Sequence, residues 1–531
     1  MARKFTRKLL AASVAALASI ALVSCSGATV EPEEGGGSDA TLIFDLGLEM
    51  TTLDPGAVFD VSAFIVTTAV YEGLVEYKTG TNEIEPALAE SWEVNDDATE
   101  HRFKLRDGVT FESGGTLTSA DVVFAYDRLK NLQGAASYLM DGLTVSADGE
   151  DTVVISSEVP QPGLLQMLTA GNFSIYDSEA IKAEGGISDE TAATEDTAAD
   201  VFAQKSFGTG AYSLKGYEPN AEVNLAFSSN WRGDEPDFTS IIIRNSRSIQ
   251  QQVLNVQNGG SDLTISLSAP QVEELDASKV NVLSQPLPQL IYMALTNSEG
   301  PTTNADFRKA IALGLDYEGL VEVAGKGAAQ ATGVIPTTVL GALSEGDALQ
   351  RDVEAAKQAL ADSGMADQEL SISFGSDYTV GGQDMGLFAQ KIQSDLQEIG
   401  MNVTLDGAPT QVSRTANQEG KIQAALWPWP PDYADPSQFL IYNPGGLLAT
   451  RTHWTAEEAP EIDALAQAAQ LAIDPADRET AYQEWARAIR DTNRFIAVVE
   501  VPQALVTSKR VGNLNMDVMG TVHLDALTLE Q

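Results

Sequence analysis

Cysteine and histidine are almost missing from this sequence, which holds one cysteine and three histidines in 531 residues. A lone cysteine cannot form an intramolecular disulfide, and such scarcity excludes a zinc ribbon or any His/Cys-rich metal cluster. Positive charge is also scarce, because 32 Lys and Arg stand against 76 Asp and Glu and leave a formal net charge of −44. Proteins that bind nucleic acids or anionic lipid surfaces do so through basic patches. The composition therefore argues against nucleic-acid binding and against adhesion to membranes through surface charge.

The motifs of nucleotide-binding and hydrolytic enzymes are missing as well. Gly208 and Gly210 are followed by Ala-Tyr-Ser, and Gly325 and Gly327 by Ala-Ala-Gln, so neither pair completes G-x-G-x-x-G. The sequence contains no P-loop, nucleophile elbow or H-E-x-x-H motif. His101, in the strand-like stretch TEHRFKL, is expected at the surface. We therefore expect no cofactor, no metal site and no enzymatic activity. The abundant carboxylates leave one alternative of another class, a secreted lipoprotein hydrolase that uses a carboxylate pair.

The N-terminus carries the one long apolar run of the chain. After a basic start, residues 9–23 span about 15 residues, which suits the core of a signal peptide and is too short to cross a bilayer. The run ends at Cys25 and resembles a bacterial lipoprotein signal, in which residues 1–24 are removed and the cysteine is lipidated. An ordinary signal peptide that happens to contain a cysteine is the alternative. Residues 25–40, rich in Gly, Ser and Glu, are expected to form a flexible tether to an extracytoplasmic membrane surface.

The mature chain shows the pattern of an α/β protein with more than one lobe. Residues 370–375 read as a strand, apolar residues recur at spacings of 3, 4, 4 and 3 over 385–399, and residues 401–405 resume as a strand. Such a β-α-β unit implies parallel strands joined by a right-handed crossover. Hydrophobic residues make up 43% of the chain, and its length suggests roughly two to four domains.

Several other elements follow from local signals. A capping box at Thr118 and Asp121 predicts the start of a helix. Residues 184–204 are acidic and poor in large apolar residues, so they are expected to form a surface excursion. Further helices are expected at 304–324, 351–363 and 475–491, the last with Asp474 as its N-cap.

Long motifs in the mature chain resemble a known family. The first half contains, in order, TLDP (52–55), VYEGLVEY (70–77), IEPALAESWEVNDDATEHRFKLRDGVTF (84–111) and LTSADVVFAYDRL (117–129). Later segments are FGTGAYSLKGYEPN (207–220), FRKAIALGLDYEGLV (307–321) and WPPDYADPSQFL (429–440). In this order and wording they resemble the extracytoplasmic solute-binding proteins of peptide, dipeptide and nickel ABC transporters, family 5. Ala211 replaces the usual proline of the family, and Tyr317 departs from its usual arginine.

The resemblance implies a two-lobed, hinged fold of the periplasmic-binding-protein type II class, with an extra subdomain on the first lobe. The strand-like stretches 285–297 and 495–506 would then cross between the lobes. Transferred by segment, lobe I comprises residues 41–75, 205–285 and 500–531, the extra subdomain residues 76–204, and lobe II residues 286–499.

The resemblance also implies candidate ligand-binding residues. In peptide-binding relatives an aspartate of the W-x-x-D-Y segment receives the ligand's ammonium group, and that position is Asp432, flanked by Trp429 and Tyr433. The alternative is that Asp432, like Asp435, only organises a turn. Other candidates are the aromatic residue Trp427, the loop of Phe59, Asp60, Val61 and Ser62, and the single residues Ser266 and Tyr292. His453 is the one candidate for a nickel chelate, and its polar surroundings favour simple exposure.

These features predict a lipid-anchored, monomeric receptor that captures a small molecule or short peptide and delivers it to an ABC permease. Separate ATPase subunits would have to supply the energy, because this chain has no P-loop. An oligosaccharide, an opine or another organic solute bound by the same fold remains an alternative ligand.

Overall fold

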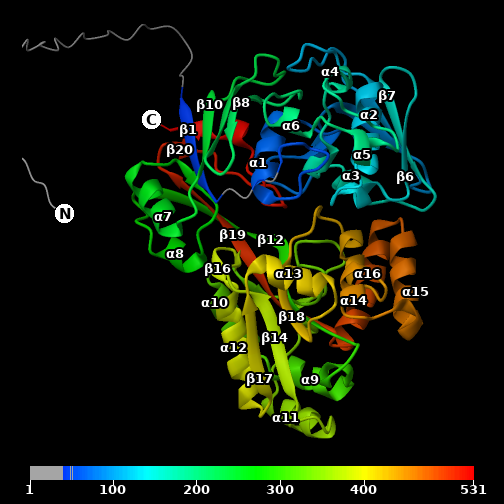
Figure 1. Ribbon diagram of the computed structural model, residues 1–531, viewed down its shortest axis with the longest axis vertical. Helices are drawn as coiled ribbons and strands as arrows, with labels where there is room; N and C mark the ends of the chain where they lie inside the picture. The colour runs from blue at the N-terminus through cyan, green and yellow to red at the C-terminus, as the bar shows by residue number, and fades with distance from the viewer. Residues whose placement is uncertain (1–39, 48–49, 51, 531) are drawn as a thin grey trace, which may run out of the picture. The chain divides into compact units, whose positions relative to one another are not determined.

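The computed structural model describes residues 40–47, 50 and 52–530 (Figure 1). The signal-like segment and Cys25 lie outside these residues. The largest element of the described residues is an eleven-stranded mixed sheet. One of its strands, β13 (Ala329–Gln330), pairs with β19 and lies off the main path of neighbouring strands. In spatial order the main path is β17 (Asn402–Ala408), β14 (Glu369–Gly375), β18 (Ala424–Trp429), β12 (Val280–Leu295), β19 (Phe495–Ser508), β11 (Leu263–Thr264), β1 (Thr41–Leu46), β10 (Ser240–Asn245), β9 (Glu222–Phe227) and β8 (Tyr212–Glu218).

The expected β-α-β unit is present. β14 and β17 pair in parallel from Glu369 with Asn402 onward, and α12 (Met385–Glu398) connects them. The five apolar residues that define its spacing are all buried. Gly400 follows the helix with φ +92°, a left-handed conformation that glycine adopts without strain. Because short-range periodicity and capping decide this unit, the sequence predicts it to within a few residues.

The other expected helices form with one break. α16 (Pro475–Asp491) has the expected bounds, with Asp474 as N-cap, and α11 (Val353–Asp362) lies within the expected range. The helix expected over 304–324 is instead two helices, α9 (Ala305–Gly314) and α10 (Tyr317–Ala324). Asp316 separates them because its carboxylate accepts a hydrogen bond from the amide of Gly319 at 3.2 Å and caps the second helix.

Two long strands join regions with separate cores. β12 and β19 pair antiparallel along most of their length, with register shifts between Pro286 and Leu290 and between Ile291 and Tyr292. One core cluster uses residues up to 263 and from 505 onward, and two others use residues 290–501. Both strand-like crossing stretches are therefore confirmed as strands, and the lobe boundaries around them stay a prediction.

A second, four-stranded sheet lies within residues 76–204. Its order is β4 (Ala89–Val94), β5 (Glu100–Leu105), β7 (Thr152–Ser157) and β6 (Leu143–Ala147). The helix α2 (Ser119–Asn131) packs on it and begins with the expected capping box of Thr118 and Asp121.

Smaller helices of the described chain are α1 (Val61–Val70), α3 (Leu164–Met167), α4 (Ser178–Ala183), α5 (Ala192–Glu195), α6 (Ala199–Phe202), α7 (Ile249–Asn258), α8 (Ala269–Glu273), α13 (Thr410–Gln418), α14 (Leu447–Arg451) and α15 (Pro460–Leu471). The remaining strands are β2 (Val75–Tyr77), β3 (Ile84–Pro86), β15 (Thr379–Val380), β16 (Gln383–Asp384), β20 (Val511–Gly512) and β21 (Thr528–Leu529). In the described part of the chain, no helix has the length and apolar character needed to cross a membrane.

The surface position expected for His101 is wrong. His101 lies in β5 between Val94 and Ile155 and is only 2% exposed. Alternation along the strand places it on the same buried face as Phe103 and Leu105. Burial lowers the pKa of its imidazole to about 4, so the ring is neutral in the folded protein at neutral pH.

His101 should make stability depend on pH. An unfolded histidine binds a proton with a pKa near 6.5, whereas the folded one does so only near 4. Stability from the neutral ring is therefore complete above about pH 6.5 and lost as the pH falls toward 4, by up to about 3 kcal/mol. Urea unfolding of the wild type and His101→Phe at pH 7 and 4.5 measures this. The wild type should lose more stability than the variant on acidification, and equal losses would contradict the assignment.

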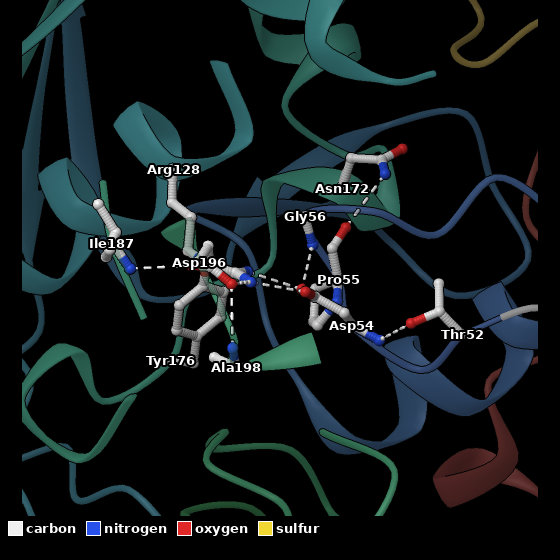
Figure 2. Close-up of polar contacts among 10 residues, drawn as sticks. All are labelled: Thr52, Asp54, Pro55, Gly56, Arg128, Asn172, Tyr176, Ile187, Asp196 and Ala198. Atoms are coloured by element: carbon white, nitrogen blue, oxygen red, sulfur yellow. Dashed lines mark hydrogen bonds and ion pairs between the residues drawn. The ribbon is translucent and has the colours of Figure 1, made fainter. Parts of the chain in front are cut away.

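The acidic stretch 184–204 is more than a surface excursion. It supplies Asp196, which is buried with Arg128 of α2 and Asp54 of the TLDP segment (Figure 2). Arg128 bonds Asp54 through Nη1 at 2.8 Å and Nη2 at 2.7 Å, and Asp196 through Nε at 2.7 Å and Nη2 at 2.9 Å. The arginine also lies 5.3 Å over the ring of Phe202. The composition of residues 184–204 does not reveal the role of Asp196, because Arg128 and Asp54 are distant in sequence.

Both carboxylates of this network also accept hydrogen bonds from backbone amides. Asp54 also accepts the amide of Gly56, and Asp196 accepts the amides of Ile187 and Ala198 (Figure 2). Burial disfavours the charged form of Arg128, but Asp54 and Asp196 favour that form more strongly, so the pKa of Arg128 is raised. Burial likewise opposes ionisation of Asp196, yet Arg128 and the two amides hold its pKa below the usual range. One guanidinium thus ties together three sequence segments.

Candidate functional site

The W-x-x-D-Y segment connects β18 to the 3₁₀ helix η5 (Pro436–Tyr442). Within it, Asp435 is 2% exposed and accepts hydrogen bonds from the amide and hydroxyl of Ser437, which caps η5. Its carboxylate also forms a paired contact with Arg478 of α16, at 2.9 and 2.6 Å. Asp435 therefore has its charge balanced inside the protein and fixes the shape of the segment.

Asp432, three residues earlier, has a different environment. Its half-buried carboxylate accepts a hydrogen bond from the hydroxyl of Tyr138. Burial raises the pKa of Asp432 above its ordinary value, although the hydrogen bond from Tyr138 acts in the opposite direction. Among the described residues, no lysine or arginine forms an ion pair with it. Such a desolvated carboxylate without a counter-ion would gain strongly from a cation placed beside it.

Two residues that sequence reasoning missed complete the surroundings of Asp432. Tyr138 lies in the 3₁₀ helix η1 (Ser137–Met140), 294 positions away. Gln438 of η5 donates from Nε2 to the Tyr138 hydroxyl at 3.5 Å, and its buried Oε1 has no hydrogen-bond partner within the described chain. No spacing rule connects these positions, because only the tertiary structure brings η1 beside η5.

Residues 76–204 approach the Asp432 segment closely at a second point. A Cβ atom on Gly163 would lie 2.6 Å from Asp435 Oδ1, which is too close for any other residue without a shift. Tyr433 packs against the core cluster that uses residues up to 263 and from 505 onward. The segment that carries Asp432 is therefore in contact with residues from the first half of the chain.

The aromatic candidates divide between the core and this segment. Tyr292 is 1% exposed and packs edge-on against Tyr442, with ring centroids 5.3 Å apart. Trp427 pairs with Tyr292 across β18 and β12, is buried, and lies 5.7 Å from the ring of Tyr378. Trp429 is half-buried, and its indole N–H lacks a partner among the described residues. Trp429, the first residue of the W-x-x-D-Y segment, thus has a buried donor that no described residue pairs.

The remaining candidates lie on other elements. Asp60 caps α1 by accepting the amide of Ala63 at 2.8 Å, and Phe59 before it is 45% exposed. Ser62 donates its hydroxyl to the carbonyl of Gly47 at 3.2 Å. Val61 begins α1, and its side chain lies outside the described part.

Ser266 follows β11 and is covered by another segment. A Cβ atom on Gly382 would lie 2.8 Å from the Ser266 carbonyl oxygen, so the turn between β15 and β16 packs against its backbone. His453 adopts φ +58°, and its Nε2 lies 3.0 Å from the carbonyl oxygen of Gly420. The structure does not bring either residue into contact with Asp432.

Known proteins resemble this chain over most of its length. The "Probable D,D-dipeptide-binding periplasmic protein DdpA" of Escherichia coli is 28% identical over 482 residues, covering 88% of this chain and 90% of that protein. The structure of DppA from Helicobacter pylori in complex with the peptide STSA superimposes with a TM-score of 0.78 at 21% identity, covering 93% of this chain and 98% of that one. AgaA from Agrobacterium tumefaciens in complex with agropinic acid superimposes with a TM-score of 0.77 at 23% identity, covering 93% and 99%.

These likenesses confirm the expected fold class, a two-lobed α/β binding-protein fold. The model of the family described as bacterial extracellular solute-binding proteins, family 5, matches residues 83–446. That match covers well over half of the chain and confirms the resemblance read from its motifs. This protein belongs to family 5 of the bacterial extracellular solute-binding proteins.

Proposed function

We propose that this protein captures a short peptide with a free N-terminus and delivers it to an ABC permease. The observation that carries the proposal is Asp432, a desolvated carboxylate that faces Tyr138 and has no ion pair in the described part of the chain. A ligand ammonium would supply the missing positive charge and three N–H donors. The carboxylate of Asp432, the Tyr138 oxygen and the orphaned Oε1 of Gln438 are acceptors available nearby.

Capture is proposed to occur by closure of two lobes. Residues 41–75, 205–285 and 500–531 would form lobe I with residues 76–204 as its extra subdomain, and residues 286–499 would form lobe II. The paired strands β12 and β19 would be the hinge, and the register shifts around Pro286–Tyr292 would let them bend. A ligand that contacts both lobes stabilises the closed form by its differential affinity.

The cellular setting is proposed from the N-terminus and the family. Lipidation of Cys25 would anchor the receptor outside the cytoplasm through the tether of residues 25–40. The receptor would act as a monomer and without catalysis, and separate ATPase subunits would drive transport. DdpA is named as a probable dipeptide-binding protein, which supports the proposal that the ligand is a peptide. AgaA, with agropinic acid bound, has the same fold, so another organic solute is the second ligand class to test.

A thermal-shift screen of the purified mature protein tests the proposal. We expect at least one of L-Ala-L-Ala, D-Ala-D-Ala and Met-Leu to raise the melting temperature, whereas maltotriose should not. A ligand at 100 times its Kd adds about 2.7 kcal/mol of apparent stability. Mass spectrometry of the recovered peptides should show them intact. Stabilisation by the sugar alone would contradict peptide capture, and cleavage of the peptide would favour a hydrolase instead.

A further inference from the structure

A turn of two glycines packs directly against backbone from a distant part of the chain. Gly381 and Gly382 form the tip of the hairpin of β15 and β16, with φ +52° and +73°. A Cβ atom on Gly382 would lie 2.3 Å from the backbone nitrogen of Ser268. A Cβ atom on Gly381 would lie 2.3 Å from Cγ1 of Val501 in β19. Neither position has room for a side chain, so the turn touches its neighbours through backbone atoms.

A second glycine meets the same segment. Gly325 follows α10 with φ +91° and faces the start of α8. A Cβ atom on Gly325 would lie only 2.6 Å from the Cβ atom of Ala269. Residues 266–270 thus meet glycine backbone from two separate loops. We call Gly325, Gly381 and Gly382, together with residues 266–270, the glycine contact.

The glycine contact and the Asp432 segment lie on opposite faces of the strands β12 and β19. Successive residues of a strand point to opposite faces. Val501, which meets the glycine turn, shares a core cluster with Ile291 of β12. The next residue, Tyr292, belongs to another cluster, and Trp429 of the W-x-x-D-Y segment packs against that cluster. Figure 1 shows α8, α10 and β16 on one side of β12 and β19, and α14 and α16 on the other.

Two faces on opposite sides of a hinge move in opposite directions. In the proposed lobes, residues 266–270 belong to lobe I and the three glycines to lobe II. A rotation about β12 and β19 that separates the lobes at Asp432 therefore presses the glycine contact together. Packed protein atoms have low compressibility, so surfaces that already touch resist this rotation. An added methyl group in the contact would be tolerated less well in an open form than in a closed one.

We propose that the glycine contact sets how far the two lobes open, and that its three glycines permit the opening through which a solute enters and leaves. This inference rests on the proposed function and deepens it, because the contact fixes the balance between the open and closed forms. The apparent dissociation constant equals the intrinsic constant divided by the fraction of protein in the competent form. By allowing the open form, the glycines lower the affinity for the solute and speed its release.

Two substitutions that add bulk to the contact test the inference. Gly382→Ala adds a methyl group to the turn, and Ala269→Leu enlarges the facing side chain at a helical position. We expect small-angle X-ray scattering to give each ligand-free variant a smaller radius of gyration than the wild type, since the open form is disfavoured. Calorimetry with L-Ala-L-Ala, D-Ala-D-Ala and Met-Leu should show roughly threefold or tighter binding of every dipeptide that the wild type binds.

A matched glycine separates the contact from backbone strain. Gly259 has φ +74°, and no described atom lies within 4 Å of a Cβ atom built on it. Gly259→Ala carries the strain of alanine in a left-handed conformation without the added contact, so its radius of gyration and affinities should match the wild type.

The outcomes keep this inference distinct from the proposed function. An unchanged or larger radius of gyration in the folded Gly382→Ala and Ala269→Leu variants would contradict the glycine contact, as would weaker peptide binding. The two substitutions alter different sides of the contact, so loss of folding in one leaves the other as the test. If the wild type binds no dipeptide, the proposed ligand is wrong, and the scattering of the ligand-free variants still decides whether the contact limits opening.

Discussion

Replacement of Arg128 by methionine should lower the free energy of unfolding by about 3–5 kcal/mol. The methionine would leave Asp54 and Asp196 facing each other in the core without the guanidinium that neutralises them (Figure 2). Both carboxylates are almost inaccessible to water, with side-chain exposures of 1% and 3%. Two unbalanced buried charges cost far more than the packing lost with one side chain. Urea unfolding monitored by circular dichroism measures the effect.

Two variants control for this result. Arg351→Met removes an exposed ion pair with Glu398 and should cost only about 0–1 kcal/mol. Arg128→Lys keeps the charge but cannot reach two carboxylates with paired bonds, so it should lie between the methionine variant and the wild type. A loss below about 1 kcal/mol in Arg128→Met would show that the network does not tie the TLDP segment to α2 and to residues 184–204.

Acid should weaken the same network. Because Arg128 holds the pKa of Asp196 below its usual range, the stabilisation from this carboxylate is complete above the unfolded value near 3.9. It is then lost as the pH falls through the lower, folded value. The Arg128→Met variant should lack this part of the acid sensitivity.

Replacement of Asp432 by asparagine should have the largest effect on binding. We expect the affinity for a dipeptide with a free N-terminus to fall roughly 30-fold or more, which corresponds to about 2 kcal/mol or above. The affinity for the N-acetylated dipeptide should change by less than about threefold, since it carries no ammonium. The asparagine keeps the size of the side chain and can still accept from Tyr138, so the fold should persist. Calorimetry with both peptides, on wild type and variant, measures the difference.

A matched aspartate and a change of pH make the Asp432 test specific. Asp477→Asn, at an exposed position of α16, should leave both affinities unchanged. In the wild type, affinity should fall with decreasing pH through the raised pKa of Asp432, because a protonated carboxyl must release its proton before it can pair with an ammonium. Equal wild-type affinity for the free and acetylated peptides would rule out the ammonium anchor.

Local sequence signals predicted the elements that depend on neighbouring residues. The capping box at Thr118, the N-cap at Asp474 and the spacing of α12 all involve partners within four positions, so the sequence alone indicates them. The break at Asp316 was missed because an aspartate inside a helical pattern can either face solvent or cap a new helix. The surface position expected for His101 is wrong because the alternation of its strand puts His101 on the buried face with Phe103.

Long ordered motifs and local periodicity are enough to indicate the family, the fold class and a candidate aspartate. Which aspartate has its charge balanced depends on contacts made in the folded chain. Asp432 and Asp435 lie three residues apart in one motif, yet Arg478 neutralises Asp435 while Asp432 meets the hydroxyl of Tyr138. Pairing and burial of charges depend on distances between segments that are tens to hundreds of residues apart, and chain folding alone sets those distances.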